Sequence, residues 1–137
     1  MLITSDEIDC NQHVSEASYY SMAVKLLQQL HQEYGFNDLF DEHRVAPVIF
    51  NTRIDFEREV FEGEEVEITV TLSPTTEDFR KWQRAFEVVN GEGRRAAVIV
   101  SDGAFFGLDT RKVTVPPKAI FDAFHGSDLV AEAPAGV

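Results

Sequence analysis

One helix-forming segment, residues 16–34, constrains the fold of this chain more than any other stretch, because no helix of similar length is expected after it. Ser15 is the expected N-cap, since its hydroxyl can accept hydrogen bonds from the first free backbone N–H groups, and Gly35 is expected to end the helix. A long helix with one apolar face needs a sheet to cover that face. The apolar residues recur at the three-and-four spacing of one helical face, and they are Tyr19, Tyr20, Ala23, Leu26, Leu27, Leu30 and Tyr34.

Four later segments have the pattern of strands. Residues 45–56, 65–72 and 79–89 alternate between apolar and polar side chains, whereas residues 96–106 are almost continuously apolar, which is typical of a central strand covered on both faces. Pro47 restricts the first of these strands to an edge or a bulge. The order of elements predicts an α+β fold in which a curled antiparallel sheet wraps one long central helix.

The connecting segments carry weaker signals. Residues 1–8 are expected to form a short opening strand, and residues 36–44 a loop with a helical turn. The last apolar strand is expected to bend at Gly103. A short helix is expected after Pro116 and Pro117, and residues 128–137 are expected to form a frayed tail.

Composition narrows the class of protein. A chain of 137 residues with 44% hydrophobic residues fits one domain, residues 1–137, with a sizeable core. The net charge of -12 argues against non-specific nucleic-acid binding and against binding to an anionic membrane. Cys10 is the only cysteine, and neither a signal peptide nor a membrane-spanning apolar run is present, so a cytoplasmic protein is expected.

The turn before the helix holds the densest cluster of reactive side chains. Residues 7–19 read EIDCNQHVSEASY, which resembles the Asp-x-Asp-x-x-Gly-His-Val-Asn-Asn-x-x-Tyr signature of hot-dog-fold acyl-CoA thioesterases of the 4-hydroxybenzoyl-CoA thioesterase type. Residues 54–56, 63–66 and 115–117 are similar to later parts of that family in order and spacing. The retained anchors are Asp9, His13 and Tyr19. The departures are Glu7, Gln12, Ser15 and Glu16.

The resemblance implies a hydrolase that converts an acyl-CoA or aryl-CoA into a free acid and CoA, without a cofactor or a metal. It places the catalytic carboxylate on Asp9, as nucleophile or general base, and the backbone N–H that polarises the thioester carbonyl near Glu16. His13 and the Glu16 carboxylate are further catalytic candidates. A structural role in the turn or at the helix start is the alternative for each of these three residues.

Substrate binding involves other candidates. Asn11 and Tyr19 lie close to the motif, although Asn11 also fits an Asx turn and Tyr19 also fits the core. The CoA phosphates need local cations, for which Arg80 and Arg84 on one strand are candidates, and a solvated strand face is the alternative for both. An acidic surface favours CoA thioesters over those of acidic acyl carrier protein.

Three other activities are weighed against hydrolysis by Asp9. The departures from the signature favour a non-catalytic acyl-CoA or acyl-ligand binding protein, and a hydratase on the same fold ranks third. Cys10 is not supported as a nucleophile, because no His partner lies at a recognised spacing. In the family, two subunits join into one continuous sheet and dimers pair into tetramers, so a homodimer and a homotetramer are expected.

Overall fold

The computed structural model describes residues 14–137. In chain order its elements are α1 (Glu16–Glu33), α2 (Phe36–His43), β1 (Val45–Phe56), β2 (Glu67–Pro74), β3 (Lys81–Val89), β4 (Arg95–Gly107), β5 (Lys112–Val113) and α3 (Lys118–His125). The predicted opening strand at residues 1–8 lies outside the described residues. The long helix and the four main strands form where the sequence predicts them.

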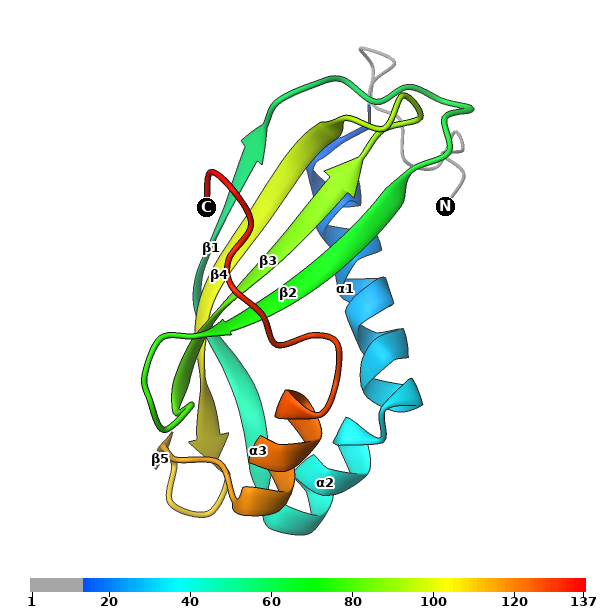
Figure 1. The fold of residues 1–137 in the computed structure, drawn as a ribbon. Helices are drawn as coiled ribbons and strands as arrows, with labels where there is room; N and C mark the ends of the chain where they lie inside the picture. Colours follow the sequence, from blue (N-terminus) through cyan, green and yellow to red (C-terminus); the bar gives the residue numbers. More distant parts are fainter. Residues whose placement is uncertain (1–13) are drawn as a thin grey trace.

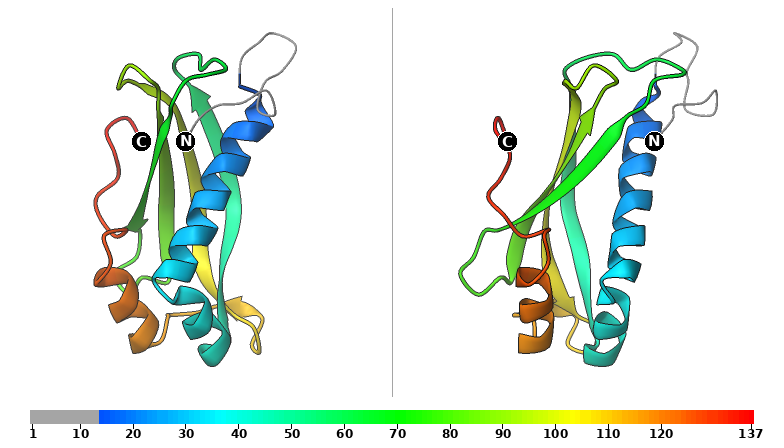
Figure 2. Two further views of the ribbon diagram at one scale, coloured as in Figure 1. Left: turned by 90° about the vertical axis from the view of Figure 1, so that its right-hand side faces the viewer. Right: turned by 45° about the vertical axis from the view of Figure 1, so that its right-hand side comes forward.

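The strands form one antiparallel sheet in the order β1-β4-β3-β2, with β5 paired to the end of β4. Helix α1 lies along one face of this sheet (Figure 1), and the segment after α3 runs over the opposite face (Figure 2). The predicted α+β architecture, with a sheet that covers one long helix, is therefore confirmed.

Helix α1 begins and ends close to the predicted residues. The Ser15 hydroxyl accepts a hydrogen bond from the Ser18 backbone N–H at 3.3 Å, as expected of an N-cap. Gly35 follows the helix with a positive φ of 74°, a conformation that glycine adopts without steric cost. Tyr19, Met22 and Ala23 are the buried residues of α1, so the predicted apolar face points toward the sheet.

Strand β4 is the centre of the sheet, with β1 and β3 on either side of it. Its residues 96–101 are all buried, which confirms the prediction of a strand covered on both faces. Pro47 lies on the edge strand β1, as predicted, and the pairing of β1 with β4 shifts between Ile49 and Asn51. Gly103 pairs with Ile49, so the irregularity expected at Gly103 is in β1 instead.

Two predictions about the connections were wrong. Residues 36–43 form a complete helix, α2, rather than a loop with one turn, because Phe36 and Phe40 lie on one helical face and both are buried. The segment after α3 is not frayed. Leu129 is buried, the Leu72 N–H donates to the Leu129 carbonyl at 2.7 Å, and the Ala131 N–H donates to the Leu72 carbonyl at 3.1 Å. The free edge of β2 provides backbone partners that hold this segment in place.

Aromatic rings fill the end of the core where α2 and α3 meet. Phe124 of α3 stacks on Phe36 with ring centroids 4.0 Å apart, and it meets the rings of Phe79 and Phe105 edge-on at 5.8 Å and 5.5 Å. These rings are buried, and together with Phe40 they form one contiguous cluster. The cluster therefore fixes the two short helices against the sheet and against the end of α1.

Candidate functional site

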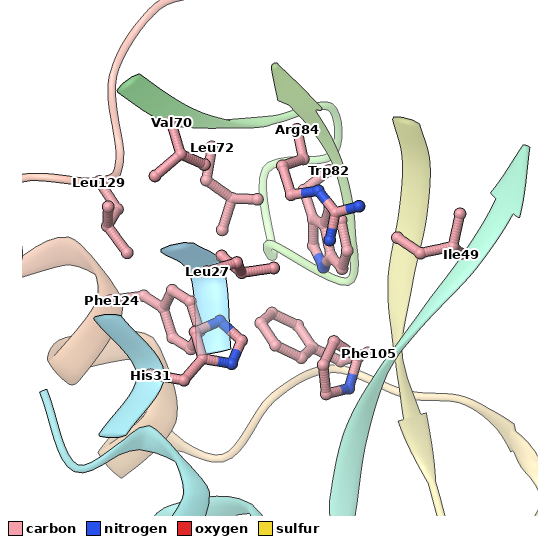
Figure 3. A pocket seen from close by; sticks show the side chains of 11 residues that line it. Leu27, His31, Ile49, Val70, Leu72, Trp82, Arg84, Phe105, Phe124 and Leu129 are labelled. Atoms are coloured by element: carbon pink, nitrogen blue, oxygen red, sulfur yellow. The ribbon is translucent and has the colours of Figure 1, made fainter. Parts of the chain in front are cut away.

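A partly open cavity of about 90 Å³ lies between α1 and the sheet, next to the aromatic cluster (Figure 3). Its wall is mainly apolar, with contributions from α1, the four strands β1, β2, β3 and β4, helix α3 and the segment after α3. The apolar side chains include Leu27, Ile49, Val70, Leu72, Phe105 and Leu129. A cavity of this composition suits the apolar part of a small ligand.

Three polar side chains interrupt the apolar wall. Trp82 and Arg84 come from β3, and His31 comes from α1 on the other side of the cavity (Figure 3). Trp82 is only 3% exposed and Arg84 only 7% exposed. The indole Nε1 of Trp82 and the guanidinium Nε of Arg84 are both buried without a hydrogen-bond partner among the described residues. Buried polar groups are usually satisfied, so each of these two atoms needs an explanation.

The existing contacts of Arg84 are weak. Its Nη2 donates to the Ser101 hydroxyl at a long distance of 3.4 Å, and its guanidinium lies 4.8 Å from the centre of the Phe86 ring. Within residues 14–137, no carboxylate forms an ion pair with Arg84. Burial lowers the pKa of Arg84, and the neighbouring Tyr20 side chain opposes part of that change. Arginine nevertheless stays protonated in proteins, so the cavity wall carries a positive charge.

His31 is held neutral at physiological pH. Burial is the main cause that lowers the pKa of its imidazole from 6.5 to about 4, and the positive charge of Arg84 lowers it further. The ring also meets Phe36 and Phe40 edge-on, with centroids 5.6 Å and 5.8 Å away. A neutral imidazole has one N–H donor and one acceptor nitrogen, so His31 can bind either kind of partner.

The protein is expected to lose stability as the pH falls from about 6.5 to about 4, in part through His31. In the unfolded chain this residue takes up a proton near pH 6.5, whereas in the folded chain it does so near pH 4. Because the unfolded state binds more protons in this window, its free energy falls relative to that of the folded state. The expected loss in unfolding free energy is on the order of 2 kcal/mol. This value is smaller than the full pKa difference implies, because His31 is only half-buried and solvent screens part of the effect.

Urea unfolding of wild type, His31→Gln and His43→Gln across this pH window tests that expectation. His31→Gln should have a flatter dependence of the unfolding free energy on pH than wild type. His43, at the end of α2 and outside the cavity, provides the matched control, and His43→Gln should keep the wild-type slope. An unchanged slope in His31→Gln would contradict the assignment.

A second, open groove lies at the start of α1. It is lined by Val14, Glu16 and Tyr19, together with residues 56–59, which follow directly from β1. The Tyr19 ring meets the Phe56 ring edge-on at 5.3 Å, and the Val14 N–H donates to the Val60 carbonyl at 3.0 Å. Burial raises the pKa of the Tyr19 hydroxyl, and the charges of Glu64 and Glu59 raise it further. The helix start is therefore fixed against the end of the edge strand.

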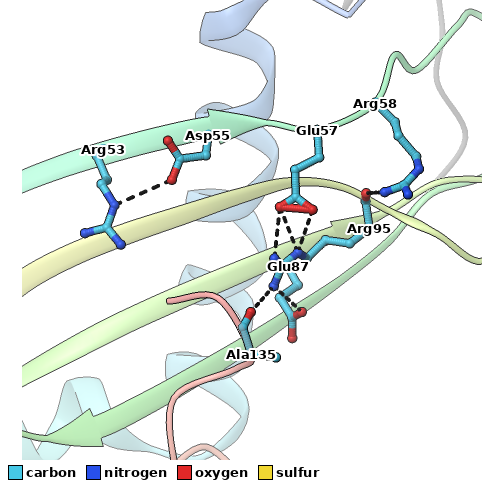
Figure 4. Close-up of polar contacts among 7 residues, drawn as sticks. All are labelled: Arg53, Asp55, Glu57, Arg58, Glu87, Arg95 and Ala135. Carbon is cyan, nitrogen blue, oxygen red and sulfur yellow. Dashed lines mark hydrogen bonds and ion pairs between the residues drawn. The ribbon is translucent and has the colours of Figure 1, made fainter.

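An ion-pair network supports the wall of this groove (Figure 4). Arg95 of β4 forms ion pairs with Glu57 at 2.9 Å and with Glu87 at 3.3 Å, and it donates to the Ala135 carbonyl at 2.7 Å. The hydrogen bond to Glu57 is the main cause that raises the pKa of Arg95. One arginine thus connects the segment after β1, the strand β3 and the C-terminal segment.

The structure brings together only some of the predicted site residues. Glu16 and Tyr19 line the groove at the start of α1, with Glu16 exposed and Tyr19 buried. Asp9, Asn11 and His13 lie outside the described residues. Arg80 and Arg84 belong to neither side of this groove.

The two arginines also differ from each other. Arg80 is exposed just before β3, where its side chain lies 3.9 Å from the Asp78 carboxylate, and Arg84 lines the cavity instead of a solvated strand face. The sequence held a signal for this position, because Arg84 falls in the same alternation as Trp82 and Phe86. A charged residue at an apolar position of a strand marks a buried polar site.

Two features are absent from the described part of the chain. Among residues 14–137, no group of His, Cys, Asp and Glu side chains is placed to hold a metal ion. None of the helices in that range is long and apolar enough to cross a membrane.

Comparisons with known proteins identify the family. The model of the thioesterase-like superfamily matches residues 3–124, so the chain belongs to this superfamily. None of the curated proteins compared with the chain matches its sequence. The match includes Asp9, the residues that line the groove, and all residues that line the cavity except Leu129.

Solved structures show the same fold at low sequence identity. The hypothetical protein SAV2348 from Staphylococcus aureus, in complex with CoA, has a TM-score of 0.80 and 14% identity over 98% of this chain and 85% of its own. A 1,4-dihydroxy-2-naphthoyl-CoA thioesterase from Synechocystis has a TM-score of 0.76 and 14% identity, and the alignment covers 93% of this chain and 94% of the Synechocystis chain. The probable thioesterase YbaW from Escherichia coli has a TM-score of 0.70 and 18% identity, and the alignment covers 90% of this chain and 92% of YbaW. The predicted hot-dog fold is confirmed.

Proposed function

We propose that this protein hydrolyses an acyl or aryl thioester of coenzyme A to the free acid and CoA. Its family supports thioester chemistry. The observation that carries the proposal is the open groove at the start of α1, which Val14 and Glu16 line, close to Asp9 in the sequence. The similar proteins from Synechocystis and Staphylococcus aureus, a CoA thioesterase and a CoA complex, support CoA as the carrier.

The helix start supplies the electrophilic half of the reaction. The first backbone N–H groups of an α-helix have no partner within the helix, and the helix dipole favours negative charge beside them. A thioester carbonyl in the groove next to Glu16 can accept from such an N–H, which stabilises the oxyanion as it forms. Tyr19, fixed by Phe56, gives that groove a rigid wall.

Asp9 supplies the other half of the reaction as nucleophile or general base. As a base, it takes a proton from water while the hydroxide oxygen bonds to the acyl carbon, and the C–S bond then breaks to release CoA. As a nucleophile, its carboxylate bonds to the acyl carbon while the C–S bond breaks and CoA leaves as the thiolate, and water then hydrolyses the resulting anhydride to the free acid and restores the Asp9 carboxylate. His13 is proposed to orient Asp9 or the water, Asn11 to position the substrate, and Glu16 to act as a second carboxylate near the carbonyl.

Arg80 is proposed to contact a CoA phosphate. It is exposed, and its ion pair with Asp78 at 3.9 Å is long enough to be exchanged for a phosphate contact. A local positive charge at Arg80 is sufficient for this contact, even though the whole chain has a net charge of -12.

Thiol release from short, long and aromatic acyl-CoAs by wild type, Asp9→Asn and Asp38→Asn tests the proposal. Wild type is expected to hydrolyse some of these esters, and Asp9→Asn to be at least about a hundredfold slower, because an amide neither attacks the thioester nor takes a proton from water. Asp38, exposed in the first turn of α2, provides a matched carboxylate-to-amide control whose activity should be unchanged.

Two results would overturn the proposal. Full activity in Asp9→Asn would remove Asp9 from the chemistry. Binding of acyl-CoA by wild type without thiol release from any ester would identify a non-catalytic acyl-CoA binding protein, the alternative that the departures at Gln12, Ser15 and Glu16 favour.

We also infer that two copies pair along β1 to form a homodimer, and that dimers join into a tetramer. Strand β1 is an edge of the sheet, and such an edge presents unpaired backbone groups to a partner. Ile49, Phe50 and Phe56 on this strand are large apolar residues that stay exposed in a single chain, Phe50 at 56%. Light scattering on the preparations used for the activity measurements should give a mass of at least two chains, and a monomer would contradict this inference.

A further inference from the structure

We propose that the cavity between α1 and β3 is a binding site for a carboxylate, which Arg84 and Trp82 hold by hydrogen bonds. The carboxylate is carried at the far end of the substrate's acyl group, and this last assignment rests on the proposed function. The protein would thus select acyl groups with an acidic end over acyl groups with a methyl end.

The first argument is the excess of donors over acceptors in the cavity wall. The Arg84 Nε and the Trp82 Nε1 are donors only, and both are buried without a partner among the described residues. His31 is neutral and can donate one more N–H. The Ser101 hydroxyl accepts from the Arg84 Nη2 at 3.4 Å and the Tyr20 side chain is a further hydrogen-bond partner of Arg84, but neither residue lines the cavity, and no lining side chain carries a carboxylate or a hydroxyl. The complementary ligand is therefore rich in acceptors.

The second argument is the charge of Arg84. A buried cation is normally paired, because the free energy lost when the cation leaves water is otherwise not offset by an ion pair. The chain has 24 acidic residues for 12 lysines and arginines, so partners are plentiful. Arg95 illustrates the usual solution, since it is bound by both Glu57 and Glu87. Arg84 is more buried than Arg95 and forms no ion pair within the described chain.

The third argument is the shape of the site. A carboxylate has two oxygens in one plane, which match the Nε and a neighbouring Nη of one guanidinium. The indole N–H of Trp82, two residues away on the same strand, points into the same cavity (Figure 3). The surrounding Leu27, Val70 and Leu72 suit the methylene groups that precede the carboxylate. With a volume of about 90 Å³, the cavity takes a small head group.

The cavity is distant from the reaction site within one chain. Leu27 lies about 16 Å along α1 from Glu16, at a rise of about 1.5 Å per residue. Pairing of two copies along β1 would bring the groove of one copy close to the cavity of the other. A fully overlapped antiparallel pair places Phe56 of one copy beside Val45 of the other. Pro47 and Ile49, which line the cavity, are on that part of β1. The acyl group held at one copy's helix start would therefore enter the cavity of the other copy.

Trp82 allows occupancy of the cavity to be measured without any chemistry. It is the only tryptophan of the chain, so intrinsic tryptophan fluorescence reports on this wall alone. We would titrate wild type, Arg84→Met and Arg44→Met with hexanoate and with 1-hexanol, which share an apolar stem and differ in the head group. Arg44 is an exposed arginine that pairs with Asp109 outside the cavity, and Arg44→Met makes the same change of side chain at the surface.

Wild type is expected to give a saturable fluorescence change with hexanoate at about tenfold lower concentration than with 1-hexanol, since hydrogen bonds to a charged group are the stronger ones. Arg84→Met should bind hexanoate about tenfold more weakly and 1-hexanol as well as wild type does. Arg44→Met should match wild type with both ligands. Equal affinity of wild type for hexanoate and 1-hexanol would overturn the proposal, and this comparison needs no variant. Equal affinity for the two ligands is also the result expected if only water occupies the cavity.

A hydrolysis measurement then tests the link to the substrate. Adipoyl-CoA and hexanoyl-CoA have acyl chains of equal length, and only adipoyl-CoA ends in a carboxylate. Wild type is expected to have a kcat/KM about tenfold higher for adipoyl-CoA, and Arg84→Met should lose that preference while it still hydrolyses hexanoyl-CoA. A preference that survives in Arg84→Met would overturn the assignment of the acidic end to this cavity.

The two proposals fail in different ways. Selective binding of hexanoate without hydrolysis of either ester would overturn the proposed function and leave the carboxylate site in place. Equal hydrolysis of both esters, together with equal binding of hexanoate and 1-hexanol, would overturn the carboxylate site and leave the proposed function in place.

Discussion

Gly103→Ala is expected to destabilise the protein by about 3 kcal/mol and to displace Trp82 from the cavity wall. A Cβ atom at Gly103 would lie 2.5 Å and 2.6 Å from two carbon atoms of the Trp82 ring, and 2.6 Å from the Val48 carbonyl oxygen. Real Cβ contacts are longer than this. The ring has to move, and so does the backbone of β1, which pairs with β4 at this point. Gly103 is thus required by the close approach of three strands.

Urea unfolding and tryptophan fluorescence measure the two effects of Gly103→Ala. The unfolding midpoint should fall without a change in the slope against urea concentration, and the emission of Trp82 should shift in the folded state. Gly91→Ala is the matched control, because the nearest atom to its new Cβ is a flexible Glu64 side-chain oxygen at 3.3 Å. That variant should stay within about 0.5 kcal/mol of wild type. A loss below about 1 kcal/mol in Gly103→Ala would contradict the expected clash.

Phe124→Ala is expected to cost about 3 to 5 kcal/mol of unfolding free energy, the range for removal of a buried phenylalanine ring. The Phe124 ring stacks on Phe36 at 4.0 Å and also contacts Phe40, Phe79 and Phe105. Through these contacts Phe124 joins α3 to α2 and to strand β4 of the sheet. The truncation therefore leaves a void where three elements meet, and it also removes part of the cavity wall.

The same urea unfolding measurement checks this prediction, with Phe124→Leu as the conservative variant. Leucine keeps most of the apolar volume, so Phe124→Leu should lose clearly less stability than Phe124→Ala. Similar losses in both variants would show that ring stacking, rather than filled volume, dominates at this position. A loss below about 2 kcal/mol in Phe124→Ala would contradict the central role of Phe124.

Much of the architecture was predictable from local patterns. The three-and-four spacing along residues 16–34 depends on which face of the helix is buried, and neighbouring residues determine that face. The alternation of Phe50 to Phe56 predicted the strand, although Phe50 and Phe56 are exposed in a single chain. The predicted strand 45–56 and the observed β1 coincide. Helix α2 was missed because its apolar face depends on two residues, Phe36 and Phe40. The position of residues 128–137 depends on the edge of β2, which is distant in sequence.

The candidate site was predictable only in part. The start of the helix follows from a local motif, and Glu16 and Tyr19 line the groove there, while their roles stay predictions. The cavity joins residues of α1, four strands, α3 and the C-terminal segment, so no single stretch of sequence contains it. Arg84 was predicted to contact a CoA phosphate, with a solvated strand face as the alternative, and the structure instead places it in the cavity wall, 7% exposed.

The C-terminal segment gives this fold an adjustable wall. Leu129 lines the cavity from within, Ala131 bonds to the edge of β2, and Val137 packs on the outer face of the sheet against Ala85, Val98 and Val100. A change in these last residues therefore reaches the ligand without altering the helix start where the reaction is proposed to occur. Substitutions in this segment would thus alter the cavity wall independently of the long helix and its motif.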